Sequence, residues 1–168
     1  MLHLRKATIA DLQTLLHWDK QIHVINADPH DDWNWEVELR QNPTWREQLI
    51  AEWNHYPIGF IQIIDPAKEE TQYWGEIEDN KRAIDIWIGE KEHLGKGYGT
   101  RMMNKALDRC FAVPEVKEVI IDPLESNRRA INFYRKIGFE FVEKRVFGND
   151  CCEVYAMSRL KWLSNFKQ

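Results

Sequence analysis

A glycine-rich loop between a strand pattern and a helix pattern is the most constraining feature of this sequence. Residues 83–88 alternate around apolar β-branched side chains and predict a strand, and Gly95, Gly97 and Gly99 follow. Residues 100–111 then carry apolar side chains at helical spacing, which predicts a helix buried along one face. Glycines let a backbone approach a ligand closely, and a helix start offers unpaired N–H groups. The sequence therefore predicts a strand-loop-helix unit that can cradle a phosphate.

This loop does not match either of the two common nucleotide-binding patterns. A Walker loop ends in Gly-Lys-Ser/Thr, whereas Gly99 is followed by Thr100 and Arg101. A dinucleotide fingerprint has the spacing Gly-x-Gly-x-x-Gly near the N-terminus, with an acidic residue about 20 positions later. Neither pattern fits, so the phosphate is expected to belong to another kind of ligand.

The other patterns predict a mixed α/β chain with no repeats and no linker, which we interpret as one domain over residues 1–168. Pro43 separates either two helical pieces or a helix and a strand. The charged stretch 66–81 predicts a loop that is functional or mobile. Further strands are expected over 2–8, 58–64, 116–122, 139–146 and 151–160, and further helices over 10–24 and 127–138, with Thr8 and Gly138 at helix ends.

Composition and charge exclude several classes of protein. The net charge is −4, from 23 Lys and Arg against 27 Asp and Glu, which disfavours nucleic-acid binding and favours a cationic substrate. No apolar run approaches the ~18 residues of a membrane span, and the N-terminus lacks an apolar secretory core. The three cysteines form no metal-ligand spacing, and Cys151 and Cys152 are expected to face opposite sides of a strand. We therefore expect a cytoplasmic protein without a metal, as a monomer or a homodimer.

A second motif, residues 127–139, gives the glycine loop its specificity. Its sequence Asn-Arg-Arg-Ala-Ile-Asn-Phe-Tyr-Arg-Lys-Ile-Gly-Phe ends a helix at Gly138 and places Tyr134 one turn before that end. Together with Leu-Gly-Lys-Gly-Tyr-Gly at 94–99, this motif resembles the GNAT family of acyl-CoA-dependent N-acetyltransferases. Leu94 departs from the family pattern, which has Gln or Arg there.

The resemblance implies an α/β (α+β) GNAT fold, with a mixed, mostly antiparallel central sheet that is splayed at the acetyl-CoA site and flanked by helices. It implies acetyl-CoA as cosubstrate. Lys96, Arg101 and Arg128 could neutralise its phosphates. The residues expected at the acetyl-CoA site are Trp87, Ile88, Leu94, Gly95, Lys96, Gly97, Tyr98, Gly99, Thr100, Asn127, Ala130 and Tyr134.

Over roughly residues 4–160 the chain is similar to the aminoglycoside 6′-N-acetyltransferase branch of that family. The similar segments surround Asp85, the loop 94–100, the run from Asp122 to Ile131, and Asp150 with Tyr155. The resemblance implies acetyl transfer to the 6′-amine of an aminoglycoside. Alternatives are another amine, such as a siderophore precursor, a polyamine or a protein N-terminus, or a non-catalytic acyl-CoA-binding module.

An amine arrives as an ammonium ion and must lose a proton before it attacks a thioester, so a carboxylate base is expected. Asp122 is the first choice, because it ends a central strand and the resemblance implies that role. Its alternative is an Asp-Pro turn. Asp85, on the strand before the glycine loop, could instead bind the substrate ammonium or act as base, or it could simply face solvent.

The leaving thiolate needs a proton, and two tyrosines are candidates. The family pattern implies Tyr134 and the branch pattern implies Tyr155, and the sequence does not choose between them. A backbone N–H at Trp87 or Ile88 is expected to meet the developing oxyanion. Substrate contacts are expected from Trp33, Trp74, Asp85, Asp150 and Glu153, with further acidic candidates at Asp28, Asp31, Asp32, Glu76, Glu78 and Asp79.

Overall fold

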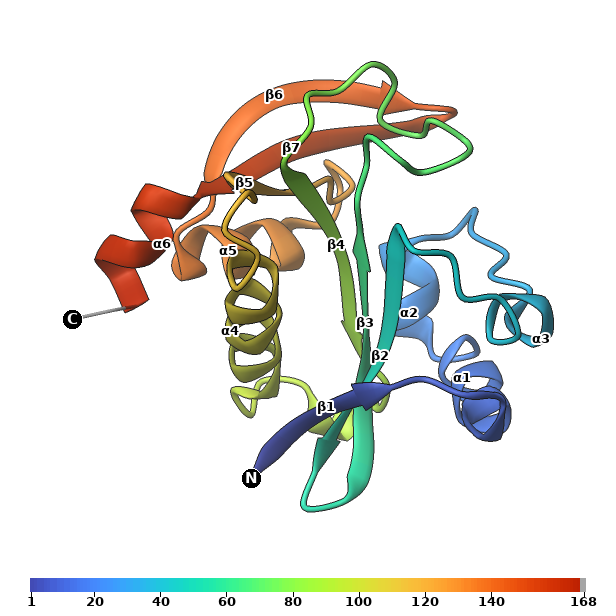
Figure 1. The fold of residues 1–168 in the computed structure, drawn as a ribbon. Helices are drawn as coiled ribbons and strands as arrows, with labels where there is room; N and C mark the ends of the chain where they lie inside the picture. Colours follow the sequence, from blue (N-terminus) through green and yellow to red (C-terminus); the bar gives the residue numbers. More distant parts are fainter. Residues whose placement is uncertain (167–168) are drawn as a thin grey trace. The chain divides into compact units, whose positions relative to one another are not determined.

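The computed structural model describes residues 1–166, which form a seven-stranded sheet in the order β1-β2-β3-β4-β5-β7-β6 (Figure 1). The strands are β1 (Leu2–Lys6), β2 (Arg46–Trp53), β3 (Tyr56–Ile64), β4 (Lys81–Ile88), β5 (Glu118–Ile121), β6 (Glu140–Phe147) and β7 (Asp150–Ser158). The helices are α1 (Leu12–Trp18), α2 (Ile22–Ala27), α3 (Trp35–Glu38), α4 (Tyr98–Phe111), α5 (Arg128–Ile137) and α6 (Arg159–Phe166), with 3-10 turns at Ile9–Asp11 and Lys91–His93.

The chain divides into two compact units that are described separately. Unit 1 comprises Met1–Gln62 and Asp85–Lys105, and unit 2 comprises Ile63–Ile84 and Ala106–Gln168. The prediction of one domain over residues 1–168 stays a prediction, and its last two residues lie outside the described part. Within residues 1–166, no helix has the length and apolar character needed to cross a bilayer, and no cluster of three or more His, Cys, Asp or Glu residues could hold a metal ion.

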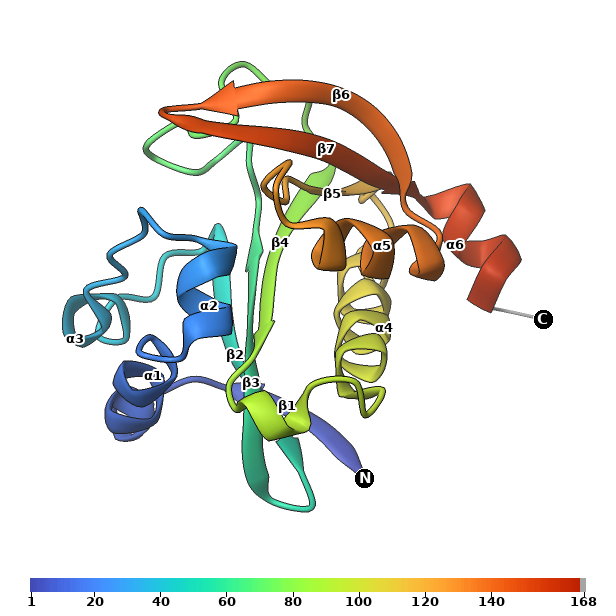
Figure 2. The same ribbon diagram turned by 180° about the vertical axis from the view of Figure 1, so that it is seen from behind.

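The strand pairings confirm the predicted fold class of a mixed, mostly antiparallel sheet with flanking helices. β1 pairs antiparallel with β2, and β7 pairs antiparallel with both β5 and β6. β6 and β7 form the long hairpin at the top of Figure 2. β4 and β5 are parallel, in a register that runs from Lys81↔Glu118 to Ala83↔Ile120. β4 continues beyond that register to Ile88, and Asp85 lies in this continuation.

The predicted helix over residues 10–24 is wrong in its continuity. The structure has a 3-10 turn, then α1, then α2, with a break at residues 19–21. Gln21 is extended (φ −72°, ψ 130°), and the Asp19 carboxylate accepts a hydrogen bond from Trp35 Nε1 at 2.6 Å. A tertiary contact that the local pattern does not contain thus accompanies the interruption. The alternatives left open around Pro43 are resolved as helix α3 followed by strand β2.

The predicted strand over 151–160 is also too long, because α6 begins at Arg159. Ser158 Oγ accepts from Lys161 N at 3.1 Å, which is a helix-start contact. The Arg159 guanidinium donates to the carbonyls of Phe111, Val113 and Val116 at 2.6–3.0 Å. The charged residue that begins the helix is therefore fixed by carbonyls at and beyond the end of α4.

The predicted apolar face of α4 is confirmed. Its six members are at most 3% exposed: Met102, Met103, Ala106, Leu107, Cys110 and Phe111. α5 likewise buries Ile131, Tyr134 and Ile137, and it ends at Gly138 in the left-handed region (φ 114°). It begins after Asn127, whose side chain accepts a hydrogen bond from Ala130 N at 3.1 Å. These two helices follow the 3.6-residue period that predicts them.

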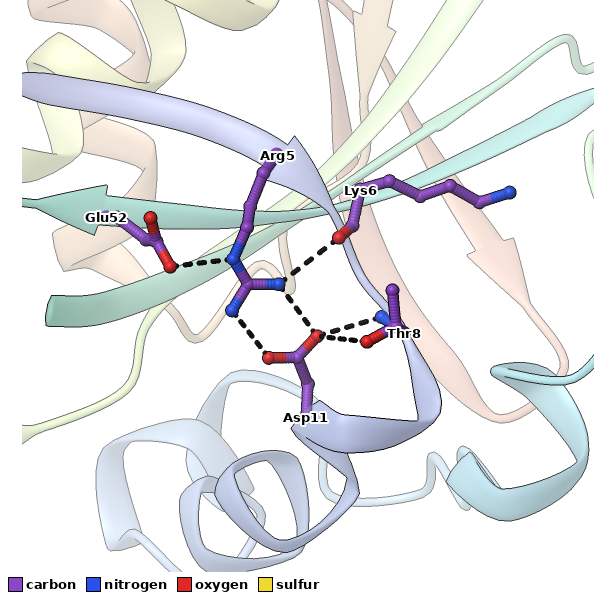
Figure 3. Close-up of polar contacts among 5 residues, drawn as sticks. All are labelled: Arg5, Lys6, Thr8, Asp11 and Glu52. Atoms are coloured by element: carbon purple, nitrogen blue, oxygen red, sulfur yellow. Dashed lines mark hydrogen bonds and ion pairs between the residues drawn. The ribbon is translucent and has the colours of Figure 1, made fainter. Parts of the chain in front are cut away.

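A charged network fastens the start of unit 1 (Figure 3). The Arg5 guanidinium donates to both oxygens of Asp11 at 2.7 and 2.8 Å and to Glu52 Oε1 at 2.6 Å. Asp11 Oδ2 also accepts from Thr8 N at 2.8 Å, and Thr8 is the predicted helix cap. Burial would raise the pKa of Asp11, but the hydrogen bonds from Arg5 and Thr8 outweigh it and hold that pKa below its usual value.

Candidate active site

The loop between β4 and α4 has the backbone shape of an anion cradle. Gly95 and Gly97 are both in the left-handed region, at φ 73° and 79°, which glycine adopts without strain. No atom lies within 4 Å of a Cβ built on either residue, so the space beside both is open. α4 begins directly afterwards at Tyr98, and the first N–H groups of a helix lack partners within it. The loop therefore fits a phosphate or pyrophosphate group.

The other predicted residues of this loop surround that backbone. Leu94 is extended (φ −67°, ψ 146°) and half-buried, and Lys96 and Thr100 are exposed. The Tyr98 ring meets the rings of Trp53 and His93 at centroid distances of 5.4 and 5.8 Å. Arg101 lies over the Trp53 ring, 5.0 Å from its centroid. The rings thus pack the helix start, while the side chain of Lys96 remains in solvent, where it can meet an anion.

Asp85 accepts a hydrogen bond from one buried amide, which is in turn bound by a second. The sequence did not indicate either amide as part of the site. Gln62 Nε2, on β3, donates to Asp85 Oδ2 at 2.9 Å, and Gln48 Nε2, on β2, donates to Gln62 Oε1 at 3.0 Å. Gln62 is 5% exposed and Gln48 is 9% exposed. A glutamine within an otherwise apolar strand pattern was the available signal, since buried amides need a specific partner.

Asp85 belongs to an acidic cluster in unit 1 whose other members are Asp19, Asp28 and Asp31. Desolvation and the charge of Asp28 raise the pKa of Asp85 to about 6, because together they outweigh the hydrogen bond from Gln62, which lowers it. Desolvation and then the charge of Asp28 raise the pKa of Asp31 above its ordinary value. Both shifts mean that the cluster favours a bound cation, which would stabilise its charged forms.

Aromatic rings in unit 1 pack together, including two predicted site residues. Trp33 stacks on Trp35 (centroids 4.8 Å, planes 3° apart) and lies 5.3 Å from Trp87. Trp87 in turn meets Phe60 at 4.6 Å. Trp33 and Trp87 are half-buried, and the Trp87 Nε1–H is buried without a partner among the described residues. Ile88, next to Trp87, has its carbonyl bound to His23 Nε2 at 2.8 Å.

In unit 2, Asp122 follows β5 and is bound by a residue that the sequence did not single out. Tyr73 Oη donates to Asp122 Oδ2 at 2.5 Å. Tyr73 lies in the segment between β3 and β4, which has no helix or strand, as predicted for the charged loop. Tyr73 is adjacent to Trp74, but 49 positions separate Tyr73 from Asp122, so no local pattern relates the two.

Glu153 and Tyr155 form a second phenol–carboxylate pair on β7. Tyr155 Oη donates to Glu153 Oε2 at 2.5 Å, and Arg128 lies 3.2 Å from Glu153 Oε1. The hydrogen bond from Tyr155 lowers the pKa of Glu153, and the charge of Arg128 lowers it further. Desolvation acts in the opposite direction but is outweighed. Desolvation and the bond to Glu153 raise the pKa of Tyr155, which is 1% exposed. Asp150 begins β7 opposite Phe147.

α5 places two other candidates. The Asn127 side chain caps the helix by accepting from Ala130 N, so both predicted residues meet in that cap. Tyr134 is 8% exposed and packs beside Phe133 and Phe139, at centroid distances of 5.2 and 5.8 Å.

Trp74 is the predicted substrate residue whose position disagrees with its expected role. Its indole is 4% exposed and packs with Phe147, Ala83 and Ile120 in the core of unit 2. Its neighbour Tyr73 is 49% exposed. The reason is that adjacent loop residues point in different directions, and the larger indole fills the core.

The chain was compared with known proteins. A family model described as an acetyltransferase (GNAT) domain matches residues 8–147. Aminoglycoside N(6′)-acetyltransferase type 1 of Klebsiella pneumoniae is 32% identical over 149 residues, covering 82% of this chain and 73% of that protein. The kanamycin resistance protein of Rhizobium radiobacter is 40% identical over 73 residues, covering 43% of this chain and 68% of its own.

The crystal structure of the aminoglycoside acetyltransferase AAC(6′)-Ib in complex with coenzyme A and kanamycin superimposes with a TM-score of 0.87, at 26% sequence identity and 100% coverage of both chains. The matched family residues include the glycine loop, both carboxylates Asp85 and Asp122, and helix α5. The protein belongs to the GNAT acetyltransferase family.

Proposed function

We propose that this protein transfers the acetyl group of acetyl-CoA to the 6′-amine of an aminoglycoside. The observation that carries the proposal is the acidic cluster around Asp85, in which the pKa values of Asp19, Asp31 and Asp85 are raised and a bound cation would favour the charged forms. Aminoglycosides carry several ammonium groups and would supply that charge. The relatives of Klebsiella pneumoniae and Rhizobium radiobacter bear names for this activity or resistance, and the AAC(6′)-Ib structure holds kanamycin.

Acetyl-CoA, when bound, supplies an acetyl thioester that an amine can attack. The open backbone at Gly95 and Gly97 and the first N–H groups of α4 are suited to its pyrophosphate. Lys96, exposed between the two glycines, adds a positive charge there. This binding needs backbone geometry rather than a particular side chain, so Leu94 in place of the family's Gln or Arg is compatible with it.

The environments of the two carboxylates support different roles for them. A general base works best when its pKa lies near the working pH, and the pKa of Asp85 is about 6. Asp122 accepts a short hydrogen bond from Tyr73, which stabilises its charged form. We assign proton removal from the amine to Asp85 and binding of a substrate ammonium group to Asp122, which exchanges the roles that the sequence favoured.

Two tyrosines remain candidates for protonating the leaving thiolate, and their environments differ. Tyr155 already donates its proton to Glu153, and its pKa is raised, so it is the poorer acid. Tyr134 precedes the C-terminal turn of α5 and is the candidate we prefer. We place the enzyme in the cytoplasm, as a monomer or a homodimer.

The test is thiol release from acetyl-CoA with kanamycin or tobramycin, in the wild type and in Asp85→Asn, Asp122→Asn and Asp108→Asn. Asp108 is an exposed acid on α4 and serves as the matched control. We expect Asp85→Asn to lower kcat by about 10²–10⁴-fold, the usual contribution of a general base. Asp122→Asn should mainly raise KM for the aminoglycoside. An active Asp85→Asn with an inactive Asp122→Asn would return the base role to Asp122.

Wild-type protein that is stabilised by acetyl-CoA yet releases no thiol with any aminoglycoside would refute the acceptor. Turnover of a polyamine or a siderophore precursor under the same conditions would then identify another amine. If no amine led to thiol release, the result would favour a non-catalytic acyl-CoA-binding module.

A further inference from the structure

We propose that Tyr73 is a positioning residue that holds Asp122 as a fixed anion ready to bind a substrate ammonium group. The inference rests on the proposed function for its substrate, and it adds a residue that acts through Asp122. It is carried by the contacts of Tyr73 within unit 2, which fix the ring, the backbone and the hydroxyl separately.

The hydroxyl contact is short. Tyr73 Oη lies 2.5 Å from Asp122 Oδ2, within the range of O–H···O⁻ bonds to a charged acceptor. Such a bond favours the ionised carboxylate over the protonated one and restricts its rotation. Asp122 follows directly on β5, so its backbone is set by the sheet and its carboxylate is set by the phenol.

The ring of Tyr73 is fixed by stacking. It lies parallel to Phe147, with centroids 4.6 Å apart and planes 5° apart. The Arg145 guanidinium sits over the Phe147 ring, 4.8 Å from its centroid, and donates to Trp74 O at 2.8 Å. β6 therefore holds both the ring of Tyr73 and the backbone of the next residue.

The backbone of Tyr73 is fixed by Glu69. Its carboxylate accepts from Thr71 N at 2.7 Å, Thr71 Oγ1 at 2.9 Å and Tyr73 N at 3.0 Å. Burial opposes the charge of Glu69, but these bonds outweigh burial and lower its pKa. Between them Gln72 adopts a left-handed conformation (φ 52°), which a residue with a side chain rarely takes without such support. The loop is thus ordered around a charged centre that delivers the phenol to Asp122.

Unit 2 contains a second pair of the same kind, which shows the electrostatic consequence. Tyr155 donates to Glu153 at 2.5 Å, and this bond is the largest cause of the lowered pKa of Glu153. Tyr73 likewise places its hydroxyl 2.5 Å from a carboxylate oxygen, at a more exposed position, so we expect its hydrogen bond to favour the ionised form of Asp122 as well.

Other charged groups lie on the elements packed next to Asp122. Glu153 N donates to Pro123 O at 3.0 Å, and Leu124 forms a β-bridge with Cys152, so β7 borders the Asp122 segment. The titratable and charged groups there include Glu153, Tyr155 and Arg128, with Asp150 at the start of β7, and Lys144 of β6 pairs with Glu125. Tyr73→Phe leaves these residues in place, and the Asp122→Asn background below tests whether the effect of the phenol passes through Asp122.

The direct experiment measures the pKa of the Asp122 carboxyl by ¹³C NMR titration in wild type and Tyr73→Phe, with the signal assigned through Asp122→Asn. Phenylalanine keeps the stacking on Phe147 and loses the donor. We expect the Asp122 pKa to rise by about one unit, as for loss of one hydrogen bond to a charged group. Tyr56→Phe, at a tyrosine that is 75% exposed in unit 1, is the matched control and should leave it unchanged.

The kinetic experiment tests whether this pair binds substrate. Tyr73→Phe should raise KM for kanamycin about fivefold, with kcat and the KM for acetyl-CoA little changed, and the rise should disappear in the Asp122→Asn background. An unchanged Asp122 pKa, or the same KM penalty with and without Asp122, would overturn the proposal. If the wild type does not acetylate kanamycin, the proposed function fails, and the NMR titration still decides whether Tyr73 controls Asp122.

Discussion

Two carboxylates of this protein, Asp85 in unit 1 and Asp122 in unit 2, are held in opposite ways. Asp85 lies on β4 behind two buried amides, Gln62 and Gln48, and among other acids. Asp122 follows β5 and receives the hydroxyl of Tyr73, a residue of a long loop. The first carboxylate is supported by strands, and the second by a segment without helix or strand.

The difference has a chemical consequence. Burial, assisted by the charge of Asp28, outweighs the hydrogen bond from Gln62 and raises the pKa of Asp85 to about 6, so that it can exchange a proton near neutral pH. At Asp122 the donor is a phenol, and its hydrogen bond favours the charged carboxylate. Residues of the same type are thereby suited to proton transfer in one place and to cation binding in the other. The predictions below test this contrast.

The largest effect is expected from Asp85→Asn on stability. Because its folded pKa lies above the ordinary value of 3.8, the folded state loses stability as the pH rises from about 4 to above 6. Removing the charge should increase the free energy of unfolding by about 2–3 kcal/mol at pH 8 and hardly at all at pH 3.5. Urea unfolding at the two pH values measures it. Asp108→Asn is the control, and an equal effect at both pH values would contradict the burial argument.

Gln62→Leu tests the amide support of Asp85. It removes the donor to the carboxylate and leaves the Gln48 amide buried without its partner, which costs about 1–3 kcal/mol. The Asp85 pKa should rise further, since an opposing hydrogen bond is gone. Replacing both glutamines by leucine should restore part of the stability without restoring that pKa. Denaturant unfolding and ¹³C titration separate the two, and a double variant with the wild-type pKa would exclude the role given to Gln62.

Arg5→Met extends the comparison to a third carboxylate, Asp11, whose burial is compensated by hydrogen bonds from Arg5 and Thr8. The folded pKa of Asp11 is lowered, so its contribution to stability is present above the unfolded pKa of about 3.8 and is lost as the pH falls through the folded value. Without Arg5 the protein should lose about 1–2 kcal/mol at pH 7, and the difference from wild type should shrink below pH 4. Thermal unfolding between pH 3 and pH 7 is the measurement. A loss that is independent of pH would indicate that the aliphatic part of Arg5 matters more than its charge.

Glu69→Gln is expected to have the smallest effect. It weakens the bonds to the backbone of Thr71 and Tyr73 while the stacking on Phe147 stays, so the melting temperature should change by less than about 2 °C. KM for kanamycin should rise about two- to threefold, because Tyr73 is less well placed against Asp122. Glu70→Gln, at the exposed neighbouring acid, is the control. A change in kcat without a change in KM would show that this loop does not contribute to substrate binding.

The sequence predicted those parts of the site that depend on neighbours along the chain. Gly95, Gly97 and Gly138 are predictable because glycine adopts the left-handed backbone that a tight loop or a helix end requires. The start of α5 is predictable because Asn127 accepts a hydrogen bond from Ala130, three residues later. The apolar face of α4 follows from its own period. The sequence-based prediction failed where contacts between distant side chains accompany a change in the backbone. One such place is the break after α1, where the Asp19 carboxylate accepts a hydrogen bond from the Trp35 indole.

By itself the sequence predicted the family, through its resemblance to known acetyltransferase motifs. It also predicted the mixed fold class, the glycine loop and two candidate carboxylates, because residue types and their spacing carry local information. Only the tertiary structure decided what surrounds each carboxylate. Gln62 reaches Asp85 across 23 positions, and Tyr73 reaches Asp122 across 49. The pKa of a carboxylate depends on burial, charge and hydrogen-bond donors in space. The chemistry of Asp85 and Asp122 therefore emerges only when the sheet and the loop bring those distant residues to them.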